Sequence, residues 1–529
     1  MASAEDDPPL PGSANPLVTG LEYDSRKIKP GNLFFAFPGI HADGHAFIAG
    51  AVSRGAEVII HQEKLGLYKD GVTYIRVKDA RLAMSAVADA FYGFPSHHMA
   101  VIGVTGTEGK STTVYLIYQL LRLLGVKAGF ISTVQRGDGK TEFPNPEHQT
   151  TPEAVTVHRL LAEMRRNGAE IAVVEASSHG LSKKTGRLGD VSFDVGVMTN
   201  VNHEHLEFHG TWEQYRNDKA ELFRTLDSSS HTKLDKKNFS SRNQAAVPSF
   251  GVVNADDPSA SYFAAATRHK TYTYSARGAG ADLSLRIIES GGGGNWYEVY
   301  TAADGEAAII RDRLPGAFNA GNVLAALLTV SQLMSLPVTQ LAPLVSRLKP
   351  VRGRMTALQK GQPFEVLVDY AHTPSSFEAI FPPLRERLSP EGRRIISVFG
   401  SAGERDTKKR SEQGRIAARY SDMVILTDED PRGEAPMSIL EEIAKGCEAD
   451  REYESKTRNK DLFLIPDRPA AIRKAFSLAE KGDLVLLLGK GHENSIIYAK
   501  ETVPYDEIAE AGKALEELGY RETEAIRKV

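Results

Sequence analysis

The sequence predicts an α/β protein with three domains. Its 529 residues are too many for a single hydrophobic core. From about residue 100 onward, apolar strand-like runs alternate with stretches of helical period, which is typical of a mainly parallel sheet with helices on both faces. A glycine-rich loop at residues 103–111 joins one such strand to one such helix. We expect domains near residues 1–99, 100–350 and 351–529.

The first of these segments contains short strands separated by turns. Residues 32–37 form an extended apolar run, which is followed by Pro-Gly and Asp-Gly turns at 38–39 and 43–44. A short helix is expected to end at Gly55, and further strands are expected at 58–60 and 72–77. This segment is therefore expected to be a small α/β domain.

The second and third segments repeat the strand and helix alternation. Strands are expected at 171–174 and 195–198 in the second segment, and a helix at 112–124. In the third segment they are expected at 366–368, 395–399, 424–426 and 484–488. Residues 226–249 are rich in Ser, Lys and Asn, and residues 291–294 are a glycine run. We expect both stretches to be mobile surface loops.

Composition narrows the class of protein. Hydrophobic residues make up 41% and charged residues 25%, as in ordinary globular proteins. A net charge of −4 argues against a nucleic-acid-binding surface. The sequence has no apolar run of about 18 residues, so we expect no membrane-spanning helix. The single cysteine, Cys447, excludes an intrachain disulfide and fits a reducing compartment, and residues 1–16 do not resemble a signal peptide. These features predict a cytoplasmic protein.

The glycine-rich loop predicts a phosphate-binding site. Its glycines let backbone N–H groups surround phosphate oxygens, Lys110 supplies a cation, and the Ser111 hydroxyl suits a phosphate-bound Mg²⁺. The usual pattern has a glycine where this chain has Val104, so a glycine turn with a chance Lys-Ser pair is the alternative. The strand before the loop and the helix after it favour ATP or GTP binding at Gly106, Thr107, Glu108, Gly109, Lys110, Ser111 and Thr112.

Polar residues follow other strands of the central segment. Glu175 ends the run Val173-Val174-Glu175, a position that commonly holds Mg²⁺ in a domain with such a loop; a surface or a salt-bridged side chain is the alternative. Three histidines, His203, His205 and His209, lie close together, but their spacing is not a standard zinc pattern. We expect one of them at the Mg²⁺ or nucleotide site. Pattern alone would place Lys219 on the surface.

These motifs resemble the Mur ligases, the ATP-dependent amide-forming enzymes of peptidoglycan precursor synthesis. The resemblance runs from about Tyr23 to near the C-terminus and is strongest to the branch that adds a diamino acid to UDP-N-acetylmuramoyl-L-alanyl-D-glutamate. The family loop has the shorter form Gly-Thr-x-Gly-Lys-Ser/Thr, which this chain matches. The resemblance implies an ATP substrate, a Rossmann-like third domain, and Mg²⁺ held by Ser111, Glu175, His205 and a carbamylated Lys219. With Lys110, the last three are the expected catalytic residues.

The resemblance also implies contacts for the other substrates. The UDP-muramoyl-peptide is expected at Ser25, His41, Ala42, Gln149, Thr150, Thr151, Ser177 and Arg187. Asn319 and Asn322 are expected on the adenine side of ATP, and the third domain is expected to bring Asp369 and His372 to the nucleotide. The incoming amino acid is expected at Arg405, Asp430, Arg432, Gly489 and Glu493.

The identity of the amino acid stays open among meso-diaminopimelate, lysine and ornithine. Residues 428–432 read Asp-Glu-Asp-Pro-Arg, where diaminopimelate-adding enzymes have Asp-Asn-Pro-Arg, so two positions differ. Arg432 keeps a guanidinium suited to a distal carboxylate. Asp430 adds a negative charge that could neutralise Arg432 or attract a distal ammonium. We therefore expect relaxed selectivity among the three.

The implied reaction is amide formation through an acyl phosphate, with small-molecule substrates and a monomeric enzyme. Two alternatives stay open. Another amide ligase of the same fold, such as a folylpolyglutamate synthase, would not need the motif Asp24-Ser25-Arg26. A non-catalytic P-loop switch would need neither Lys219 nor an amino-acid pocket. Turnover of ATP that depends on the UDP-dipeptide would separate a ligase from a switch.

Overall fold

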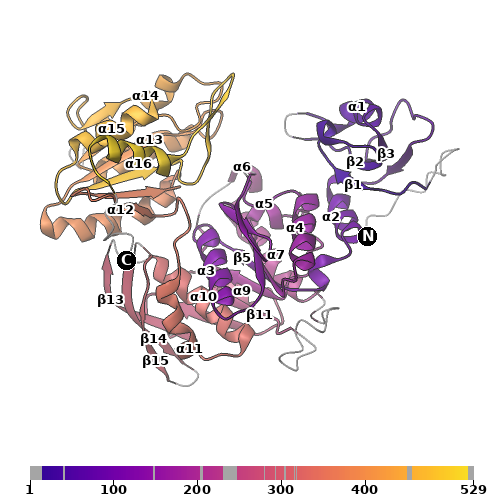
Figure 1. Cartoon of the computed structure of the whole chain (residues 1–529), viewed down its shortest axis with the longest axis horizontal. Coiled ribbons are helices and arrows are strands. Elements are labelled where there is room, and N and C mark those ends of the chain that lie inside the picture. Colours follow the sequence, from indigo (N-terminus) through magenta and orange to yellow (C-terminus); the bar gives the residue numbers. More distant parts are fainter. Residues whose placement is uncertain are drawn as a thin grey trace. The chain divides into compact units, whose positions relative to one another are not determined.

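The chain forms two α/β units. The computed structural model describes residues 15–39, 42–146, 149–202, 206–229, 231, 247–278, 280–291, 294–302, 305–314, 316, 318–449 and 455–521. The first unit comprises Met1–Tyr274 with Ala325–Leu336, and the second comprises Ser275–Leu324 with Pro337–Val529. Mainly parallel sheets covered by helices occur in both (Figure 1), which confirms the predicted α/β class.

The N-terminal part of the first unit is a four-stranded parallel sheet. Its order is β1 (Gly20–Glu22), β2 (Asn32–Phe35), β3 (Ala56–His61) and β4 (Thr73–Arg76). Leu33 and Phe35 pack with helix α2 (Ala80–Phe91), whereas Phe34 faces helix α1 (Ile48–Ser53) on the other side. Because both faces are covered, the three residues of β2 that follow Asn32 are all apolar. The expected strands and the short helix are confirmed.

A larger sheet carries the glycine-rich loop. In the first unit its strands follow the order β12-β11-β10-β5-β9-β6-β7-β8, parallel from β12 to β6 and antiparallel at β7 and β8. The bounds are β5 (Ala100–Thr105), β6 (Ala128–Ile131), β7 (Gln135–Gly137), β8 (Glu142–Pro144), β9 (Ile171–Glu175), β10 (Val195–Met198), β11 (Phe250–Asn254) and β12 (Thr271–Ser275). The predicted strands at 171–174 and 195–198 are β9 and β10.

Helices cover this sheet and fill its core. They are α3 (Lys110–Leu123), α4 (Ala154–Arg166), α5 (Ser178–Leu181), α6 (Leu206–His209), α7 (Trp212–Leu226) and α9 (Ala260–Ala264). Leu161 of α4 and Phe223 of α7 share one buried cluster with Val101 of β5 and Val174 of β9. The strands β10, β5 and β9 are parallel neighbours, so their carboxyl ends meet at one edge, where ligands of such sheets bind.

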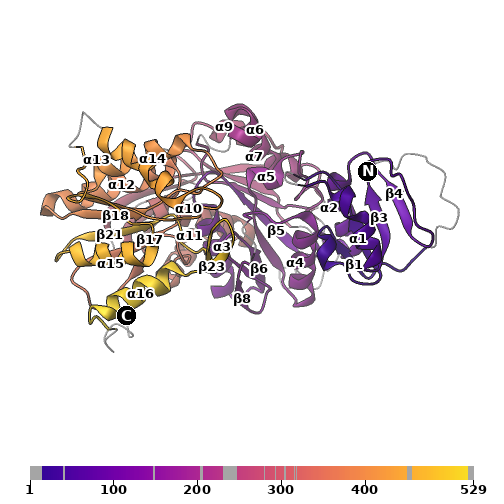
Figure 2. The same cartoon turned by 90° about the horizontal axis from the view of Figure 1, so that it is seen from above.

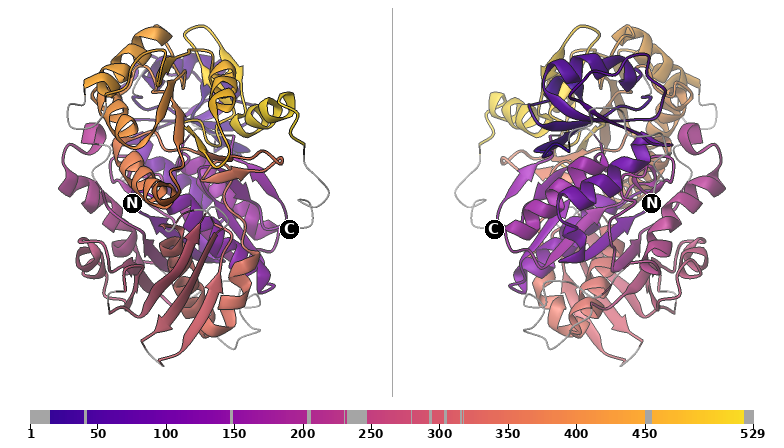
Figure 3. Two further views of the ribbon diagram at one scale, coloured as in Figure 1. Left: turned by 90° about the vertical axis from the view of Figure 1, so that its left-hand side faces the viewer. Right: turned by 90° about the vertical axis from the view of Figure 1, so that its right-hand side faces the viewer.

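The second unit begins with an antiparallel meander that the sequence did not predict. It consists of β13 (Leu283–Gly291), β14 (Gly294–Thr301) and β15 (Ala307–Arg311) (Figure 3). Gly291 pairs with Gly294, so these glycines end two paired strands instead of lying in a separate loop. Gly294 has φ +123°, a conformation that favours glycine in a hairpin. Helix α10 (Phe318–Met334) follows, of which Ala325 onward is assigned to the first unit, and α11 (Val338–Leu341) belongs to the second unit again.

The rest of the second unit is a six-stranded sheet between two helical layers. Its order is β16 (Thr356–Leu358), β17 (Glu365–Asp369), β21 (Leu484–Leu488), β18 (Ile395–Phe399), β19 (Met423–Leu426) and β20 (Leu462–Leu464). Only β16 is antiparallel to its neighbour. Helices α12 (Pro374–Leu388), α13 (Lys408–Tyr420) and α14 (Pro436–Ala449) cover one face, and α15 (Arg468–Leu478) and α16 (Glu507–Glu517) cover the other (Figure 2). A small hairpin, β22 (Ser495–Ile497) and β23 (Thr502–Pro504), completes it.

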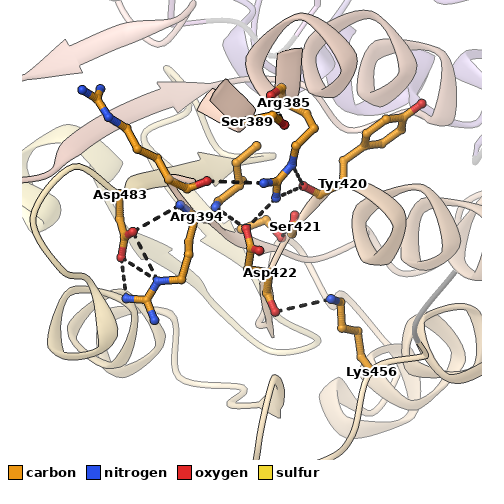
Figure 4. A network of polar contacts seen from close by, with 11 residues as sticks. Arg385, Ser389, Arg394, Tyr420, Ser421, Asp422, Lys456 and Asp483 are labelled. Atoms are coloured by element: carbon orange, nitrogen blue, oxygen red, sulfur yellow. Dashed lines mark hydrogen bonds and ion pairs between the residues drawn. The ribbon is translucent and has the colours of Figure 1, made fainter. Parts of the chain in front are cut away.

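Charged residues at one edge of this sheet form hydrogen bonds and ion pairs with one another and with the backbone. Arg385 of α12 donates to the backbone oxygen of Tyr420 and to Asp422, each at 2.5 Å (Figure 4). Asp422 also accepts the N–H of Ile395 at 2.7 Å, while Arg394 pairs with Asp483 at 2.6 Å. These contacts lie at the ends of β18 and β19, away from the carboxyl ends that carry the loops described below.

One sequence expectation, the loop at residues 226–249, lies largely outside the described residues. Residue 230 and residues 232–246 of the expected loop at 226–249 are not among the described residues, so its mobility stays a prediction. Within the described residues, no single helix is long and apolar enough to cross a membrane. A bent pair, Asn319–Met334 with Val338–Arg347, passes that test on length and composition only.

Candidate active site

The glycine-rich loop runs from the end of β5 into the first turn of α3. Gly106 has φ +149°, and a side chain there would collide with Thr199, whose Oγ1 would lie 1.9 Å from the added Cβ. Gly109 has φ +83° and precedes Lys110, the first residue of α3. Both positions therefore need glycine, which explains their spacing in the shorter loop form. The loop presents the amino end of a 14-residue helix, which favours an anion.

Residues after β10 hold this loop in place. The Thr199 hydroxyl donates to the Glu108 oxygen at 2.6 Å, and the Glu108 N–H donates to Asn200 Oδ1 at 2.8 Å. The Thr107 N–H reaches the Asn200 backbone oxygen at 2.8 Å. Thr199 and Asn200 were not predicted as site residues, because they act on the loop from 91 or more positions away.

The predicted cation folds back onto its own loop. Lys110 Nζ donates to the Thr107 backbone oxygen at 2.7 Å, in a partly buried contact. That contact is a single hydrogen bond to a neutral acceptor, which a phosphate oxygen could replace with a stronger, charge-assisted one. Lys110 is therefore positioned beside the anion site that the helix end provides.

Glu175 lies opposite the first turn of α3 and is buried, with 1% of its surface exposed. Its Oε1 accepts the Ser111 hydroxyl at 3.0 Å and the Thr133 hydroxyl at 2.9 Å, and its Oε2 accepts the Thr133 N–H at 2.8 Å. The alternative of a surface glutamate is therefore wrong. Ser111 and Glu175 bring together the oxygen ligands that suit Mg²⁺. Thr133 was not predicted.

Lys219 is buried, with 1% exposed, so the surface position that pattern alone indicates is wrong. Its Nζ donates to the Gly106 backbone oxygen at 2.5 Å and lies 4.4 Å from the centre of the Tyr215 ring. Tyr215 is one helical turn earlier in α7 and is fully buried, so both side chains share the face turned toward the loop. The helix thus delivers a lysine to the phosphate loop. As an ammonium group this lysine is not a metal ligand.

Of the three neighbouring histidines, only His209 is among the described residues. His203 and His205 lie outside the described residues, so the expected metal role of His205 stays a prediction. His209 has both ring nitrogens engaged, Nδ1 with Asp218 at 2.7 Å and Nε2 with the Ser178 hydroxyl at 3.1 Å. Among the residues that the structure describes, no group of three His, Cys, Asp or Glu side chains could hold a metal ion. His209 is a structural link between α5 and α7.

Three predicted substrate residues meet beside Glu175. Thr151 Oγ1 donates to the Glu175 backbone oxygen at 3.0 Å and accepts both the N–H and the hydroxyl of Ser177, at 3.1 and 2.9 Å. Arg187 donates to the Thr151 oxygen at 2.9 Å and to Glu153 at 2.8 Å. Glu153 also receives Arg81 at 2.8 Å, so it holds two guanidinium groups.

The other described residues that are predicted to bind the UDP-muramoyl-peptide lie in loops and turns. Thr150 is half-buried, while Gln149, at the start of the same loop, is exposed. Ser25 begins a short 3-10 turn, Ser25–Lys27, and Ala42 is exposed. His41 lies outside the described residues. Their contact with a uridine nucleotide stays a prediction.

Four predicted nucleotide residues belong to the second unit. Asn322 Nδ2 donates to Asn319 Oδ1 at 2.9 Å, one turn apart on α10. Asp369 ends β17 and accepts the N–H groups of Met355 and Ala371 at 2.7 and 2.8 Å; burial raises the pKa of its carboxyl. His372 Nδ1 is 2.8 Å from the Tyr370 oxygen. Their part in ATP binding stays a prediction.

The loops at the carboxyl ends of β19 and β21 hold a buried charge cluster. Lys490 is fully buried and donates to Asp430 Oδ1 at 2.9 Å and to Glu493 Oε2 at 2.6 Å. Burial opposes its charge, but Glu493 and Asp430 outweigh that effect and raise the pKa of Lys490. Asp430 Oδ1 also accepts the Ile497 N–H at 2.9 Å, and the Tyr370 hydroxyl donates to Glu493 Oε1 at 3.1 Å. Among the described residues, the ion pair that Asp430 makes is with Lys490, which it shares with Glu493. The effect of Asp430 on Arg432 or on a distal ammonium stays a prediction.

Arg432, two positions after Asp430, has a side-chain donor without a partner among the described residues. Its backbone has φ +52° and its N–H is held by the Ile497 oxygen at 2.9 Å, while its side-chain Nε is buried without a hydrogen-bond partner. Arg405 is exposed. Gly489 has φ +99°, and a Cβ there would lie 3.0 Å from Glu429 Oε2. The sequence did not point to Lys490, whose partner Asp430 is 60 positions away.

The carboxyl group of Asp428, in the same loop, is expected to make the free energy of unfolding depend on pH. Burial raises the pKa of its carboxyl from 3.8 to about 6, against the lowering effects of the Tyr498 hydroxyl and Arg468. The stabilisation tied to the protonated form is complete below pH 4 and is lost as the pH rises through 6. Asp428→Asn should therefore remove this loss, and raise the free energy of unfolding at pH 7 by up to about 3 kcal/mol. Urea unfolding of both proteins from pH 4 to 8 measures it; parallel curves would contradict the expectation.

Comparisons with known proteins identify the family of this chain. Three family models match: "Mur ligase family, catalytic domain" at residues 17–92, "Mur ligase middle domain" at 104–330, and "Mur ligase, glutamate ligase domain" at 353–491. The chain is 50% identical to the UDP-N-acetylmuramyl-tripeptide synthetase of Treponema pallidum (strain Nichols), over 94% of this chain and 93% of that protein.

More distant relatives extend the likeness. The UDP-N-acetylmuramoyl-L-alanyl-D-glutamate–2,6-diaminopimelate ligase of Geobacillus kaustophilus (strain HTA426) is 37% identical over 96% of this chain and 98% of its own. A solved structure of a ligase of that same name is 26% identical, covers 95% of this chain and 96% of its own, and has a TM-score of 0.60. The predicted resemblance is confirmed, and this chain belongs to the Mur ligase family.

Proposed function

We propose that this chain adds a diamino acid to the D-glutamate γ-carboxylate of UDP-N-acetylmuramoyl-L-alanyl-D-glutamate, at the expense of ATP, in peptidoglycan precursor synthesis. The observation that carries the proposal is the meeting of Lys110, Lys219 and the Ser111–Glu175 pair around one phosphate loop. A switch that only binds nucleotide needs no buried lysine facing that loop. The match over residues 17–92 argues against a folylpolyglutamate synthase, which would not need that domain.

The chemistry follows from the residues around the loop. The γ-carboxylate oxygen attacks the γ-phosphorus of ATP, the bond to ADP breaks, and an acyl phosphate forms. Lys110 balances the charge that spreads over the transferring oxygens, which is the main catalytic work in such reactions. The neutral amine of the diamino acid then attacks the acyl carbon, loses a proton, and inorganic phosphate leaves. Mg²⁺, for which the oxygens of Ser111 and Glu175 fit, would add positive charge at the phosphates.

The acid substrate is assigned to the residues beside Glu175. Thr151 and Ser177 are linked to each other and to the strand that carries Glu175, so a carboxylate bound there would lie close to the phosphate loop. Arg187 contributes a guanidinium at the same place. We infer that these three residues orient the peptide end of the substrate. We also infer a monomeric enzyme in the cytoplasm; the single free thiol of Cys447, which is buried, fits the reducing conditions of that compartment.

The experiment that tests the reaction measures phosphate release. The purified protein is given ATP, Mg²⁺, the UDP-muramoyl-dipeptide and, in turn, meso-diaminopimelate, lysine or ornithine. We expect release only when the dipeptide and at least one amino acid are both present, with the tripeptide product seen by mass spectrometry. Release without the dipeptide would contradict the ligase and favour a simple ATPase.

Selectivity among the amino acids is predicted to depend on Arg432. Only diaminopimelate has a distal carboxylate, and its pairing with a guanidinium is worth roughly 1.5–3 kcal/mol. Arg432→Ala should therefore lower kcat/KM for diaminopimelate about 10- to 100-fold relative to lysine, with the KM for ATP unchanged. The measurement is kcat/KM for all three amino acids in parent and variant.

Asp430→Asn serves as the matched control. Because Asp430 is already engaged in an ion pair with Lys490, we expect the variant to change the ratio of diaminopimelate to lysine by less than about threefold and to lower the melting temperature. A tenfold or larger rise in that ratio would show that Asp430 acts on the substrate directly. An unchanged ratio in Arg432→Ala would remove Arg432 from the pocket.

A further inference from the structure

Thr133 lies next to the predicted metal site but has no role in the proposed reaction so far. It follows β6 and makes two hydrogen bonds to one carboxylate: its N–H reaches Glu175 Oε2 at 2.8 Å and its hydroxyl reaches Oε1 at 2.9 Å. Both oxygens of Glu175 are thus fixed by one residue. A carboxylate held at both ends cannot rotate freely about its last bond, so its direction is set.

The segment that carries Thr133 is itself anchored. Asn145 Nδ2 donates to the backbone oxygens of Ser132 and Thr133, at 3.0 and 3.2 Å, and the Ser132 N–H donates to the Gln135 oxygen at 3.1 Å. Because these bonds act on the backbone, they hold the position of Thr133 without using its hydroxyl. The two groups that contact Glu175 are therefore presented by a segment with a fixed position.

The direction of Glu175 matters because of Ser111. The Ser111 hydroxyl donates a hydrogen bond to Glu175 Oε1 at 3.0 Å, and the same oxygen accepts a hydrogen bond from the Thr133 hydroxyl. A hydroxyl that donates its proton keeps two lone pairs, and these are what a cation requires. If Glu175 turned, Ser111 would turn with it, and its lone pairs would point elsewhere.

We propose that Thr133 is a positioning residue for the nucleotide-bound divalent cation: it fixes Glu175, which in turn orients the Ser111 hydroxyl toward the metal. This inference rests on the proposed function, because it assumes that the loop binds a metal nucleotide. Outer groups that orient metal ligands typically change metal affinity 10- to 100-fold when they are removed. A purely structural tether would change stability and leave that affinity alone.

The test compares the metal affinity of four variants with that of the parent protein. Thr133→Val and Thr133→Ala remove the hydroxyl and keep the N–H, Thr133→Ser restores a hydroxyl, and Ser132→Ala removes the neighbouring hydroxyl, which is not bonded to Glu175. The probe is Mn²⁺ with a non-hydrolysable ATP analogue, and free Mn²⁺ is measured by electron paramagnetic resonance. Melting temperatures without metal are recorded for each.

We expect the Kd for Mn²⁺ in Thr133→Val to rise about tenfold, with Thr133→Ser and Ser132→Ala within about twofold of the parent. The alanine variant decides the matter if the valine variant does not fold. Parental Kd values in the valine or alanine variant, or an equal loss in Thr133→Ser, would overturn the proposal. Because Mn²⁺ binding is measured without turnover, a parent protein that lacks ligase activity would contradict the proposed function and leave this result interpretable.

Discussion

Lys110→Ala should lower ligase activity by about 1,000-fold or more and leave the fold intact. The lysine is the cation at the amino end of α3, and cations that stabilise a transferring phosphoryl group contribute on this scale. In the free protein its Nζ makes one partly buried hydrogen bond, to the Thr107 oxygen at 2.7 Å, which is worth only about 1 kcal/mol. Activity and stability should therefore respond very differently. Phosphate release and a thermal melt measure the two effects.

The matched control for this variant is an exposed lysine of the same unit. Lys140 lies in an exposed turn between β7 and β8, and Lys140→Ala should leave activity and melting temperature unchanged. Near-normal turnover in Lys110→Ala would contradict the assignment of the phosphate site. A large fall in melting temperature would show that the lysine supports the loop itself.

Much of the fold follows from short-range pattern. The strands β9, β10, β18 and β21 are buried at every position, so each appears in the sequence as an apolar run, broken only by Glu175 at the end of β9 and by Ser397 in β18. The glycine-rich loop is equally visible, since its glycines are required by φ values that other residues rarely adopt. The meander β13–β15 has no such signal, because its exposed and buried residues alternate and its order depends on pairing with neighbours.

The site was predictable only where its residues lie in the motif or in a resemblance. Ser111 and Glu175 were both predicted, but their contact joins positions 64 apart in the sequence. Thr133, Lys490 and the burial of Lys219 depend on such distant contacts, and none has a local pattern. A lysine on a helix is usually at the surface. The buried position of Lys219 becomes evident only when α7 packs its Tyr215 face against the loop.

That position leads to the second large effect, which concerns the chemical state of Lys219. The amine can add CO₂ and lose a proton, which gives an anionic carbamate with two oxygen ligands in place of an ammonium cation. We propose this modification because Lys219 lies at the loop that carries Lys110 and contacts Gly106 at 2.5 Å, where a carbamate oxygen would suit a metal cation bound to the phosphates. Lys219→Ala should then lose about 1,000-fold or more in activity.

Chemical rescue separates a carbamate from a structural lysine. A small carboxylate such as formate or acetate can enter the space that Lys219→Ala leaves, and it should restore part of the activity. Lys219→Arg should stay inactive, because guanidinium cannot carry the modification and places a cation near the metal. Lys183 is the control. It is an exposed lysine outside α7, and its Nζ lies 3.3 Å from Glu221 of α7, the helix that carries Lys219. Lys183→Ala should need no rescue.

The modification itself can be observed directly. With ¹³C-bicarbonate, the parent protein should show a carbamate carbonyl resonance that is absent in Lys219→Ala and present in Lys183→Ala. Loss of the signal on removing CO₂ should parallel loss of activity, because both depend on the same group. If Lys219→Ala retains full activity, or loses it without any rescue and the parent shows no carbamate signal, the buried lysine acts as a cation that holds Gly106. In that case the metal would depend on the remaining ligands of the loop.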